Sequence, residues 1–420
     1  MQALPGFRDF LPDDCAARNY IFGRWREVAR RYGFVEWDGP VLEPTDLYRK
    51  KSGAEIVDQL FNFTDKGDRE VSMRPELTPT LARVVAAHER AFKKPLKWFS
   101  IGQFFRYEKQ QRGRLREHYQ LNCDIMGEKS VEADAEIIAL AIDVLRAFGL
   151  TETDFAVKIS DRGAWNDFLP QFGITPDQIP EFLKVVDRLD REELQAVEPA
   201  LRRFGVSTAD LVAFLAQANL DWFTALRERL EARGVLRFCE FNLRIVRGLP
   251  YYSGTVFEVF DRAGKLRAIA GGGRYDNLIN QLSDGAVSMP ALGFAMGDVV
   301  LGELLRDRAA AREKLEAAVK EQNMIDIYVV IAKEQRRPDA LEQIQELRDR
   351  RYRVDYPLTA DKVAKQFQTA ENIGARITLL YGDEWPQVKV KNLSTREESL
   401  IAGEALLDSV AKFFNVSGSA

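Results

Sequence analysis

The chain has 420 residues, of which 46% are hydrophobic and 30% charged, a composition typical of globular proteins with more than one domain. Its formal net charge of −4 excludes a generally basic nucleic-acid-binding protein, so any contact with RNA must come from local patches. The three cysteines, Cys15, Cys123 and Cys239, form no CxxC pair, and there are two histidines. This usage argues against a disulfide framework and a Cys/His zinc site, and for a reducing compartment.

The first residues, MQALPGFRDFLPDD, contain no apolar run of the kind that a signal peptide needs, and acidic residues come early. No stretch of the chain approaches the roughly 20 apolar residues that cross a bilayer. We therefore expect a cytoplasmic protein without a membrane partner.

The N-terminal part predicts alternating helices and strands. Residues 13–33 show apolar side chains at helical spacing, and the extended segment GFVEWDGPVLEP follows. Pro40 interrupts that segment, which favours a strand at an edge or an interface. Two further strands are expected at 59–64 and 69–74, and a helix is expected to open with Pro75. Glu76 and Thr78 then fall in its first turn, where a capping role would also explain them.

Residues 98–127 predict two strands joined by a short basic loop. The second strand alternates, with Gln120, Asn122 and Asp124 on one face and apolar side chains between them. The loop contains four cations: Lys109, Arg112, Arg114 and Arg116. On spacing alone, a solvated edge hairpin and a polar recognition face with phosphate-compatible cations explain the pattern equally well.

In the rest of the chain the predicted secondary structure changes twice. Residues 162–233 read as mostly helical, an insertion between strands at 155–160 and 236–246. The glycines Gly271, Gly272 and Gly273 are predicted to form a turn between a strand at 266–270 and a helix. A charged helical linker is expected at 303–323, and strands then alternate with helices in a small α/β domain with a parallel sheet.

Three stretches together resemble one family. FRYEKQQRGRLREHYQLNCDIMG resembles motif 2 of class II aminoacyl-tRNA synthetases, RGLPYYSGTVFE with AGGGRYDNL resembles the signature of the histidine-specific enzymes, and GFVEWDGPVLEP looks like motif 1. The chain is thus similar to the histidine–tRNA ligase family over essentially its whole length. The resemblance implies an α/β (α+β) fold in which helices flank an antiparallel catalytic sheet. It also implies a homodimer formed through motif 1.

The same resemblance divides the chain into five parts. The catalytic domain would comprise residues 1–161 and 234–302, interrupted by the helical insertion 162–233. A linker helix at 303–323 would lead to an anticodon-binding domain at 324–420, where Lys362, Lys365 and Gln366 share one helical face. For each of these three residues, a solvated helix face is at least as good an explanation as contact with the anticodon.

The family joins L-histidine to its tRNA through a histidyl-adenylate, consuming ATP with Mg²⁺ and releasing AMP and diphosphate. Such chemistry needs fixed cations and in-line placement more than a nucleophilic side chain. By resemblance, Arg106 and Arg247 are the catalytic cations that bridge carboxylate and α-phosphate, and both belong to the histidine site as well. Glu108 would bind the adenine edge and Arg114 the outer phosphates.

Histidine itself needs an ammonium site and an imidazole site. By resemblance, Glu76, Thr78 and Gln120 bind the ammonium group, and Asp124 and Tyr252 bind the two ring nitrogens. Tyr251 and Tyr275 would lie nearby. A pocket that pairs both ring nitrogens rejects other amino acids by about 10⁴-fold, because its buried polar groups would stay unpaired.

Three positions depart from the family pattern and suggest a divergent branch. Val300 stands where the third motif usually has an ATP-binding arginine, and Arg267 and Arg274 are candidates to replace it by sequence proximity. Pro250 stands where Asp is frequent. Asp124 stands where Glu is frequent and is shorter by one methylene. His118 is assigned a structural or RNA-facing role.

A second function remains open, that of a catalytically silent paralogue that senses histidine and regulates its biosynthesis. Val300 favours that alternative. The C-terminal domain and Arg247 favour the enzyme, because such paralogues generally lack both.

Overall fold

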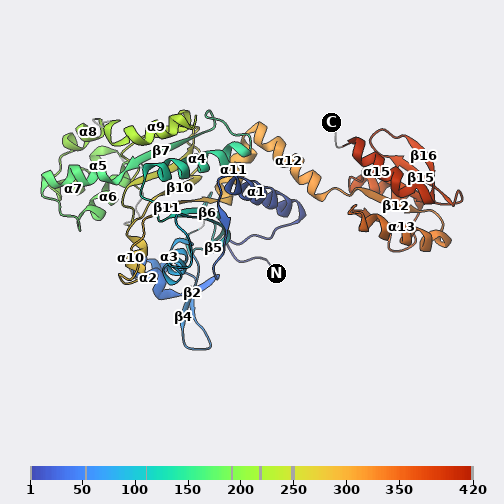
Figure 1. The fold of residues 1–420 in the computed structure, drawn as a ribbon, viewed down its shortest axis with the longest axis horizontal. Helices are drawn as coiled ribbons and strands as arrows, with labels where there is room; N and C mark the ends of the chain where they lie inside the picture. Colours follow the sequence, from blue (N-terminus) through green and yellow to red (C-terminus); the bar gives the residue numbers. More distant parts are fainter. Residues whose placement is uncertain are drawn as a thin grey trace. The chain divides into compact units, whose positions relative to one another are not determined.

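The computed structural model describes residues 2–52, 54–109, 111–190, 193–216, 220–246 and 251–417. The chain divides into two compact units, Met1–Ala318 and Val319–Ala420. Figure 1 shows the first unit in blue to orange and the second in orange to red.

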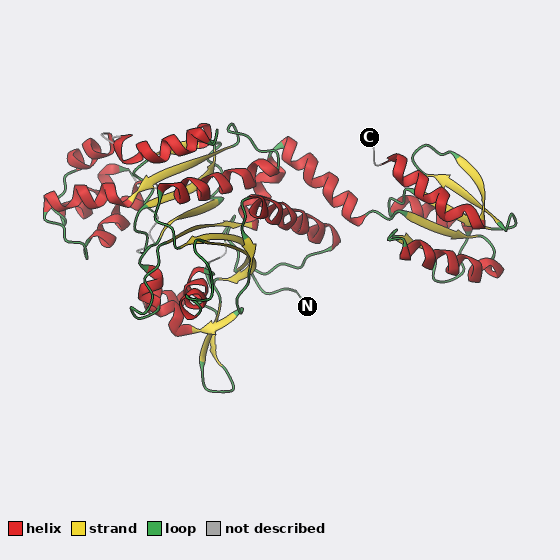
Figure 2. Cartoon of the chain, in the orientation of Figure 1, coloured by secondary structure: helices red, strands yellow, loops and turns green. Residues whose placement is uncertain are grey.

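The first unit is built on an eight-stranded sheet, visible as yellow arrows in Figure 2. Its order is β1-β5-β6-β11-β10-β9-β7-β8. The five central pairings, from β5/β6 to β9/β7, are antiparallel, and β1/β5 and β7/β8 are parallel. The strand bounds are β1 Val35–Glu36, β5 Leu96–Phe105, β6 Glu117–Met126, β7 Phe155–Asp161, β8 Cys239–Phe241, β9 Thr255–Asp261, β10 Ala270–Arg274 and β11 Ala291–Gly297. This confirms the predicted fold class.

Helices cover one face of this sheet. The apolar residues of β6, Leu121, Cys123 and Ile125, are at most 2% exposed. Arg274 of β10 pairs with Leu292, which in turn pairs with Ile125, so these three side chains share a face. Since Arg274 bonds to Asp134 of α4 (Val131–Ala147), that is the face on which α4 packs. The opposite face is left for Gln120, Asn122 and Asp124. Two further helices flank the sheet, α1 (Pro12–Arg31) and α11 (Asp298–Asp307).

A small antiparallel sheet lies beside the main one, in the order β2-β4-β3. Its strands are β2 Leu42–Pro44, β3 Asn62–Thr64 and β4 Glu70–Met73, and the helices nearby are α2 Thr45–Ser52, α3 Thr78–Ala87 and α10 Leu278–Leu282. The expectation that α3 opens with Pro75 is wrong, because α3 begins at Thr78 and carries Pro79 in its first turn instead. Glu76 therefore lies before the helix and is not a residue of its first turn.

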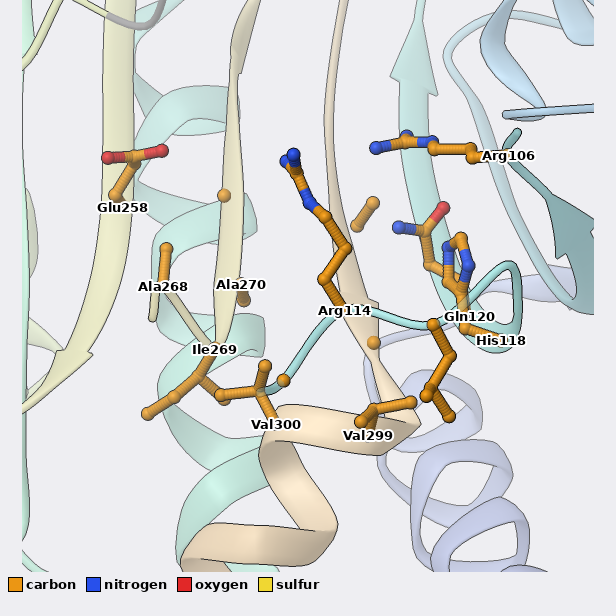
Figure 3. Close-up of a pocket in the computed structure, with 15 residues that line it drawn as sticks. Arg106, Arg114, His118, Gln120, Glu258, Ala268, Ile269, Ala270, Val299 and Val300 are labelled. Carbon is orange, nitrogen blue, oxygen red and sulfur yellow. The ribbon is translucent and has the colours of Figure 1, made fainter. Parts of the chain in front are cut away.

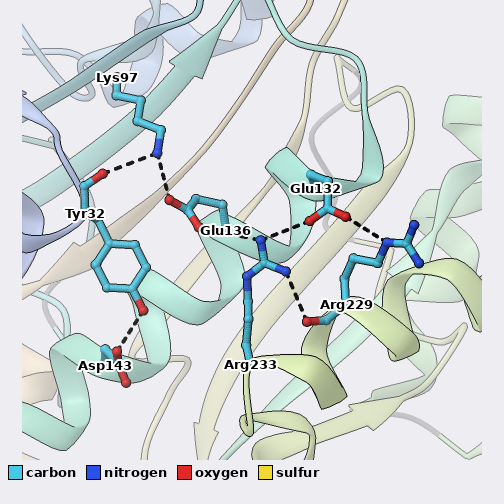
Figure 4. A network of polar contacts seen from close by, with 7 residues as sticks. All are labelled: Tyr32, Lys97, Glu132, Glu136, Asp143, Arg229 and Arg233. Carbon is cyan, nitrogen blue, oxygen red and sulfur yellow. Dashed lines mark hydrogen bonds and ion pairs between the residues drawn. The ribbon is translucent and has the colours of Figure 1, made fainter.

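The segment predicted to be mostly helical, 162–233, is mostly helical in the residues that the structure describes. It contains α5 Arg162–Phe168, α6 Ile179–Asp187, α7 Leu194–Arg202, α8 Thr208–Ala216 and α9 Thr224–Ala232. Figure 4 shows how α9 is fastened to α4. Arg229 and Arg233 bind the two oxygens of Glu132 at 2.8 and 3.0 Å, and Lys97 of β5 binds Glu136 of α4 at 2.7 Å. Because these ion pairs are partly exposed, each contributes under about 1 kcal/mol to the free energy of folding. Together they stabilise the packing of α9 on α4 more than any one of them does.

The predicted turn at the glycine triplet is wrong. Gly271, Gly272 and Gly273 lie inside strand β10 and pair with both β9 and β11. A Cβ on Gly272 would lie 2.3 Å from the carbonyl oxygen of Gly293, so only glycine lets β11 approach this closely. The strand predicted at 236–246 is also shortened to β8, preceded by a 3-10 turn at Leu236–Phe238.

The second unit contains a five-stranded sheet in the order β13-β12-β14-β15-β16. β13, β12 and β14 are parallel as expected, but β15 and β16 are antiparallel, so the sheet is mixed and not purely parallel. The strands are β12 Ile327–Ile331, β13 Val354–Asp355, β14 Ile377–Tyr381, β15 Gln387–Asn392 and β16 Glu398–Ala402; the helices are α13 Arg337–Asp349, α14 Val363–Asn372 and α15 Leu406–Ser417.

Two details complete the fold. The segment expected to be one linker helix contains the end of α11, a break at Arg308 and α12 (Ala309–Asn323). Gln366 of α14 is 1% exposed and bonds to both backbone groups of Ile331 in β12, at 2.8 and 3.0 Å. It does not share the exposure of Lys362 and Lys365, and so the structure removes it from the face expected to meet RNA. The remaining 3-10 turns are Ala54–Gln59, Leu169–Phe172, Arg188–Asp190, Leu220–Phe223, Glu334–Arg336 and Gly403–Ala405.

Candidate active site

The open face of the main sheet carries a polar row beside a row of small residues. Gln120, Asn122 and Asp124 of β6 pair in register with Gly297, Ala295 and Gly293 of β11. β10 continues this floor, because Gly271 and Gly273 pair with Ala295 and Gly293. With no side chain larger than methyl on these positions, a ligand can lie directly on the sheet and meet the polar row from the side.

A cavity of about 90 Å³, here called the inner cavity, lies over this floor. Eight of the nine residues expected to bind histidine line it: Glu76, Thr78, Arg106, Gln120, Asp124, Tyr251, Tyr252 and Tyr275. The ninth, Arg247, lies outside the described residues. Residues from five separate segments of the chain are thus brought together as the resemblance implied.

Asp124, which lines the inner cavity, is held in place by a hydrogen bond. The buried hydroxyl of Tyr275 donates a hydrogen bond to its Oδ1. Burial, and then the Asp124 carboxylate, raise the pKa of Tyr275 well above its usual value, so the phenol keeps its proton and stays a donor. A Cβ on Gly293 would lie 2.1 Å from Asp124 Oδ1, so that glycine makes room for the carboxylate.

A second space, the outer cavity, has a volume of about 210 Å³. Figure 3 shows Arg106 and Arg114 extended toward it, with Glu258 across from Arg114 and Val299 and Val300 at one end. Arg106, Gln120, Gly271 and Ala295 line both cavities. Arg106 Nε donates to the carbonyl oxygen of Pro75 at 3.1 Å, which anchors its guanidinium at the junction.

His118 lines the outer cavity, at the strand end that the resemblance places near the adenine. Burial, followed by the positive charges of Arg106, Arg8 and Arg114, lowers the pKa of His118 to about 3. The ring is therefore neutral at physiological pH. The alternation that places Gln120 on the open face also places His118 there, so the sequence contained the signal.

Glu108 and Arg114 are paired with each other. Glu108 Oε2 lies 2.9 Å from Arg114 Nη1. Arg114 lines the outer cavity as expected, whereas Glu108 is not among the described residues that line either cavity. The pair can hold the loop between β5 and β6 against a nucleotide, but only Arg114 reaches the cavity in this conformation.

Of the two arginines considered as replacements for the cation missing at Val300, Arg267 lies next to the outer cavity and Arg274 does not. Arg274 is 7% exposed, pairs with Asp134 at 2.7 Å and lies on the helix-covered face of the sheet, away from both cavities. Arg267 lines a hollow of about 270 Å³ that shares Gly113 and Val300 with the outer cavity. Arg112 and Lys265 line the same hollow, so it is rich in positive charge.

Arg8, in the N-terminal segment, binds two elements that line the outer cavity, β6 and α11. Arg8 binds Glu117 of β6 at 2.7 Å and Asp298 of α11 at 2.9 Å. Asp298 also accepts from the backbone N–H of Tyr119 at 2.8 Å. Burial raises the pKa of Asp298 while Arg8 opposes that rise. These contacts fix the start of α11, and with it Val299 and Val300, against β6.

Within the part of the chain that the structure describes, no group of three or more His, Cys, Asp or Glu side chains could hold a metal ion. Glu258 is the carboxylate of the outer cavity. A single carboxylate fits a hydrated Mg²⁺ that is bound mainly by substrate phosphates. Among the described helices, none has the length and apolar character needed to cross a membrane.

Comparisons with known proteins agree with this geometry. A family model described as "Histidyl-tRNA synthetase" matches residues 6–301, and one described as "Anticodon binding domain" matches residues 326–413. The histidine–tRNA ligase of Opitutus terrae is 43% identical over 440 residues, covering 99% of this chain and 99% of that protein. The chloroplastic/mitochondrial histidine–tRNA ligase of Arabidopsis thaliana is 37% identical, covering 94% and 83%. The crystal structure of apo histidyl-tRNA synthetase from S. aureus superposes with a TM-score of 0.73 at 25% identity, covering 98% of this chain and 100% of that one.

Proposed function

The chain belongs to the histidyl-tRNA synthetase family, and on that premise we propose that the inner cavity holds histidine and the outer cavity holds ATP. The chain is an aminoacyl-tRNA synthetase that charges tRNA with histidine, which confirms the activity expected from its sequence. The histidine-sensing alternative is not favoured, because the relatives are named ligases over nearly the full chain and the anticodon-binding domain is present.

The observation that carries the proposal is the position of Arg106, which lines both cavities. In the first step a carboxylate oxygen of histidine attacks the α-phosphorus, the bond to the β-phosphate breaks and diphosphate leaves. A guanidinium at the junction can bind the carboxylate and the α-phosphate together and stabilise the charge that develops between them. In the second step a ribose hydroxyl of the tRNA attacks the acyl carbon and AMP leaves.

Histidine would lie along the polar row with its ammonium group toward Gln120, Glu76 and Thr78. Its ring would reach Asp124 and Tyr252, with Tyr251 and Tyr275 behind them. Rings of Tyr251 and Tyr252 pack with centroids 4.8 Å apart, which stiffens this wall. Arg247, by resemblance, would complete the site as a second cation near the carboxylate.

ATP would extend from Arg106 into the outer cavity. Arg114 would bind its outer phosphates and Glu108 would bind the adenine edge once the loop rearranges. We extend the assignment to Arg267, because its hollow adjoins the outer cavity at Val300 and supplies positive charge there. Mg²⁺ bound with ATP would neutralise phosphate charge, and Glu258, which lines the outer cavity, would help to hold it.

The test is histidine-dependent exchange of labelled diphosphate into ATP, followed by transfer of labelled histidine to tRNA. We expect both activities. Arg247→Ala should abolish exchange while histidine binding, measured by calorimetry, remains detectable. Normal exchange by Arg247→Ala would refute the role given to that residue without affecting the assignment of the cavities.

We also propose the homodimer that motif 1 implies. Four apolar side chains near the small sheet and the edge strand β1 are exposed: Val35 at 64%, Val41 at 41%, Leu42 at 47% and Phe63 at 49%. Apolar side chains beside an edge strand fit an isologous contact with a second copy. Analytical ultracentrifugation should find a dimer, and Val41→Glu should shift it toward monomer; a monomeric wild type would contradict this.

The second unit is the part proposed to meet the anticodon, with exposed Lys362 and Lys365 contributing positive charge. The proposal also assigns the protein to the cytoplasm. Its support is that Cys15, Cys123 and Cys239 are free thiols.

A further inference from the structure

Asn122 carries a buried donor that no described atom satisfies. The side chain is 5% exposed, and its Nδ2 has no hydrogen-bond partner in the described structure. Leaving a buried amide donor unpaired is energetically costly, so such groups in folded proteins call for an explanation. The explanation that fits here is a ligand atom.

The position of Asn122 shows where that ligand atom must be. The residue lines the inner cavity. Its register partners are Ser100 on β5 and Ala295 on β11, which are too small to cover it. It stands in the polar row between Gln120, next to the proposed ammonium site, and Asp124, at the ring site. The unpaired donor therefore lies alongside the middle of a histidine bound along this row.

A neutral imidazole needs two different partners. One ring nitrogen carries a proton and donates, and the other carries a lone pair and accepts. The Asp124 carboxylate suits the donating nitrogen. The accepting nitrogen needs a donor, and Asn122 Nδ2 is a neutral donor placed beside it. An imidazolium, with two N–H groups, would instead set an N–H against the Asn122 amide.

We propose that Asn122 donates a hydrogen bond from Nδ2 to the unprotonated ring nitrogen of histidine and so makes the inner cavity select the neutral imidazole. This inference rests on the proposed placement of histidine in that cavity. Asn122 then takes the second ring nitrogen, which the resemblance had assigned to Tyr252, and Asn122 and Asp124 together recognise one acceptor and one donor on the ring. An amino acid whose ring lacks the lone pair would leave the Asn122 donor unpaired and bind less tightly.

The experiment measures KM for histidine in diphosphate exchange between pH 5.5 and pH 8. An unperturbed histidine ring has a pKa of about 6.5, so the neutral fraction falls about tenfold per pH unit below that value. For the wild type we expect KM to rise as that fraction falls. A triazole analogue of histidine, whose ring stays neutral over this range, should keep a constant KM and thereby separate titration of the substrate from titration of the enzyme.

Two variants test the role of the donor. Asn122→Ala should raise KM about tenfold at pH 8, and the ratio of variant to wild type should shrink toward 1 at pH 5.5. Asn122→Asp, which has the same shape but accepts instead of donating, should raise KM more at pH 8 and flatten or reverse the pH profile. Ser100→Ala, a buried neighbour on the same face, should leave KM unchanged.

A structural role alone would give a ratio of variant to wild-type KM that is the same at every pH, and that result would overturn the inference. So would an Asn122→Asp enzyme with the wild-type profile. Failure of the wild type to exchange diphosphate with histidine is a different result, because it would refute the proposed placement of the substrates.

Discussion

The two cavities differ in how they are built, although they share a wall. The inner cavity takes its floor from strands β6, β10 and β11, and its Asp124 carboxylate is held by Tyr275. The outer cavity takes part of its wall from the loop between β5 and β6 and from the start of α11. Strands hold side chains rigidly, which suits the site for histidine, because histidine must be distinguished from other amino acids. A loop with cations suits ATP, which is recognised largely by its charge and can be enclosed on binding.

The junction between the cavities should be the most sensitive point. Arg106→Ala is expected to lower kcat/KM for exchange about 10³-fold, because it removes the cation shared by both substrates. Arg202→Ala, which removes an exposed cation paired with Glu198 on α7, is the control and should change the rate by less than threefold. Similar losses in the two variants would mean that the position of Arg106 at the junction does not carry the catalysis.

The rigidity of the inner cavity can be tested at Gly293. Gly293→Ala would place a Cβ 2.1 Å from Asp124 Oδ1 and 2.7 Å from the Cys123 carbonyl oxygen, so we expect KM for histidine to rise about 100-fold. Gly23→Ala in α1 is the control, since its Cβ would meet nothing within 4 Å and the residue lines neither cavity. Circular dichroism and thermal melting establish that both variants fold. Unchanged KM in folded Gly293→Ala would show that Asp124 does not need its present position.

The contribution to ATP binding of the hollow beside the outer cavity can be tested at Arg267. Arg267→Ala is expected to raise KM for ATP about tenfold and to leave KM for histidine unchanged, because one partly exposed phosphate contact is worth about 1.4 kcal/mol. Arg262→Ala, which removes a cation paired with Glu240 in the same region, should leave both constants unchanged. An effect on histidine alone would place Arg267 in the wrong cavity.

His118 gives the smallest expected effect, on stability. Its pKa is about 3 in the folded protein against about 6.5 in the unfolded chain, so the unfolded state takes up the extra proton as pH falls below 6.5. Stability is thus fully present above pH 6.5 and declines below it. The His118 side chain is partly exposed, which reduces this effect. The free energy of unfolding lost between pH 7 and pH 5, measured by urea denaturation, should therefore be about 1 kcal/mol smaller in His118→Phe than in the wild type. An identical loss in the two proteins would mean that the ring is not buried.

Local patterns predicted the parts of the site that lie on one strand. The alternation of β6 placed Gln120 and Asp124 on one face correctly, and the described residues that the family resemblance grouped with them line the same cavity. The glycine triplet was misread because three glycines look the same in a turn and in a strand. Only the close approach of β11 to Gly272 decides between them, and no local pattern contains that distance.

Other features depended on contacts between distant segments. Gln366 has a polar side chain on a helical face, and burial against Ile331 becomes visible only when α14 packs on β12. Asn122 was placed on the right face, but its unpaired donor could be found only once Ser100 and Ala295 were known as its neighbours. The choice between Arg267 and Arg274 likewise required knowing the two faces of the sheet.

The central claim is that the two cavities form one continuous site that meets at Arg106. The most direct measurement is the dissociation constant, by isothermal titration calorimetry, of a histidyl-adenylate analogue with a sulfamoyl group in place of the phosphate. If the cavities join, this one molecule fills both, and it should bind at least about 100-fold more tightly than histidine or ATP alone. An analogue that binds no more tightly than either substrate would contradict the account.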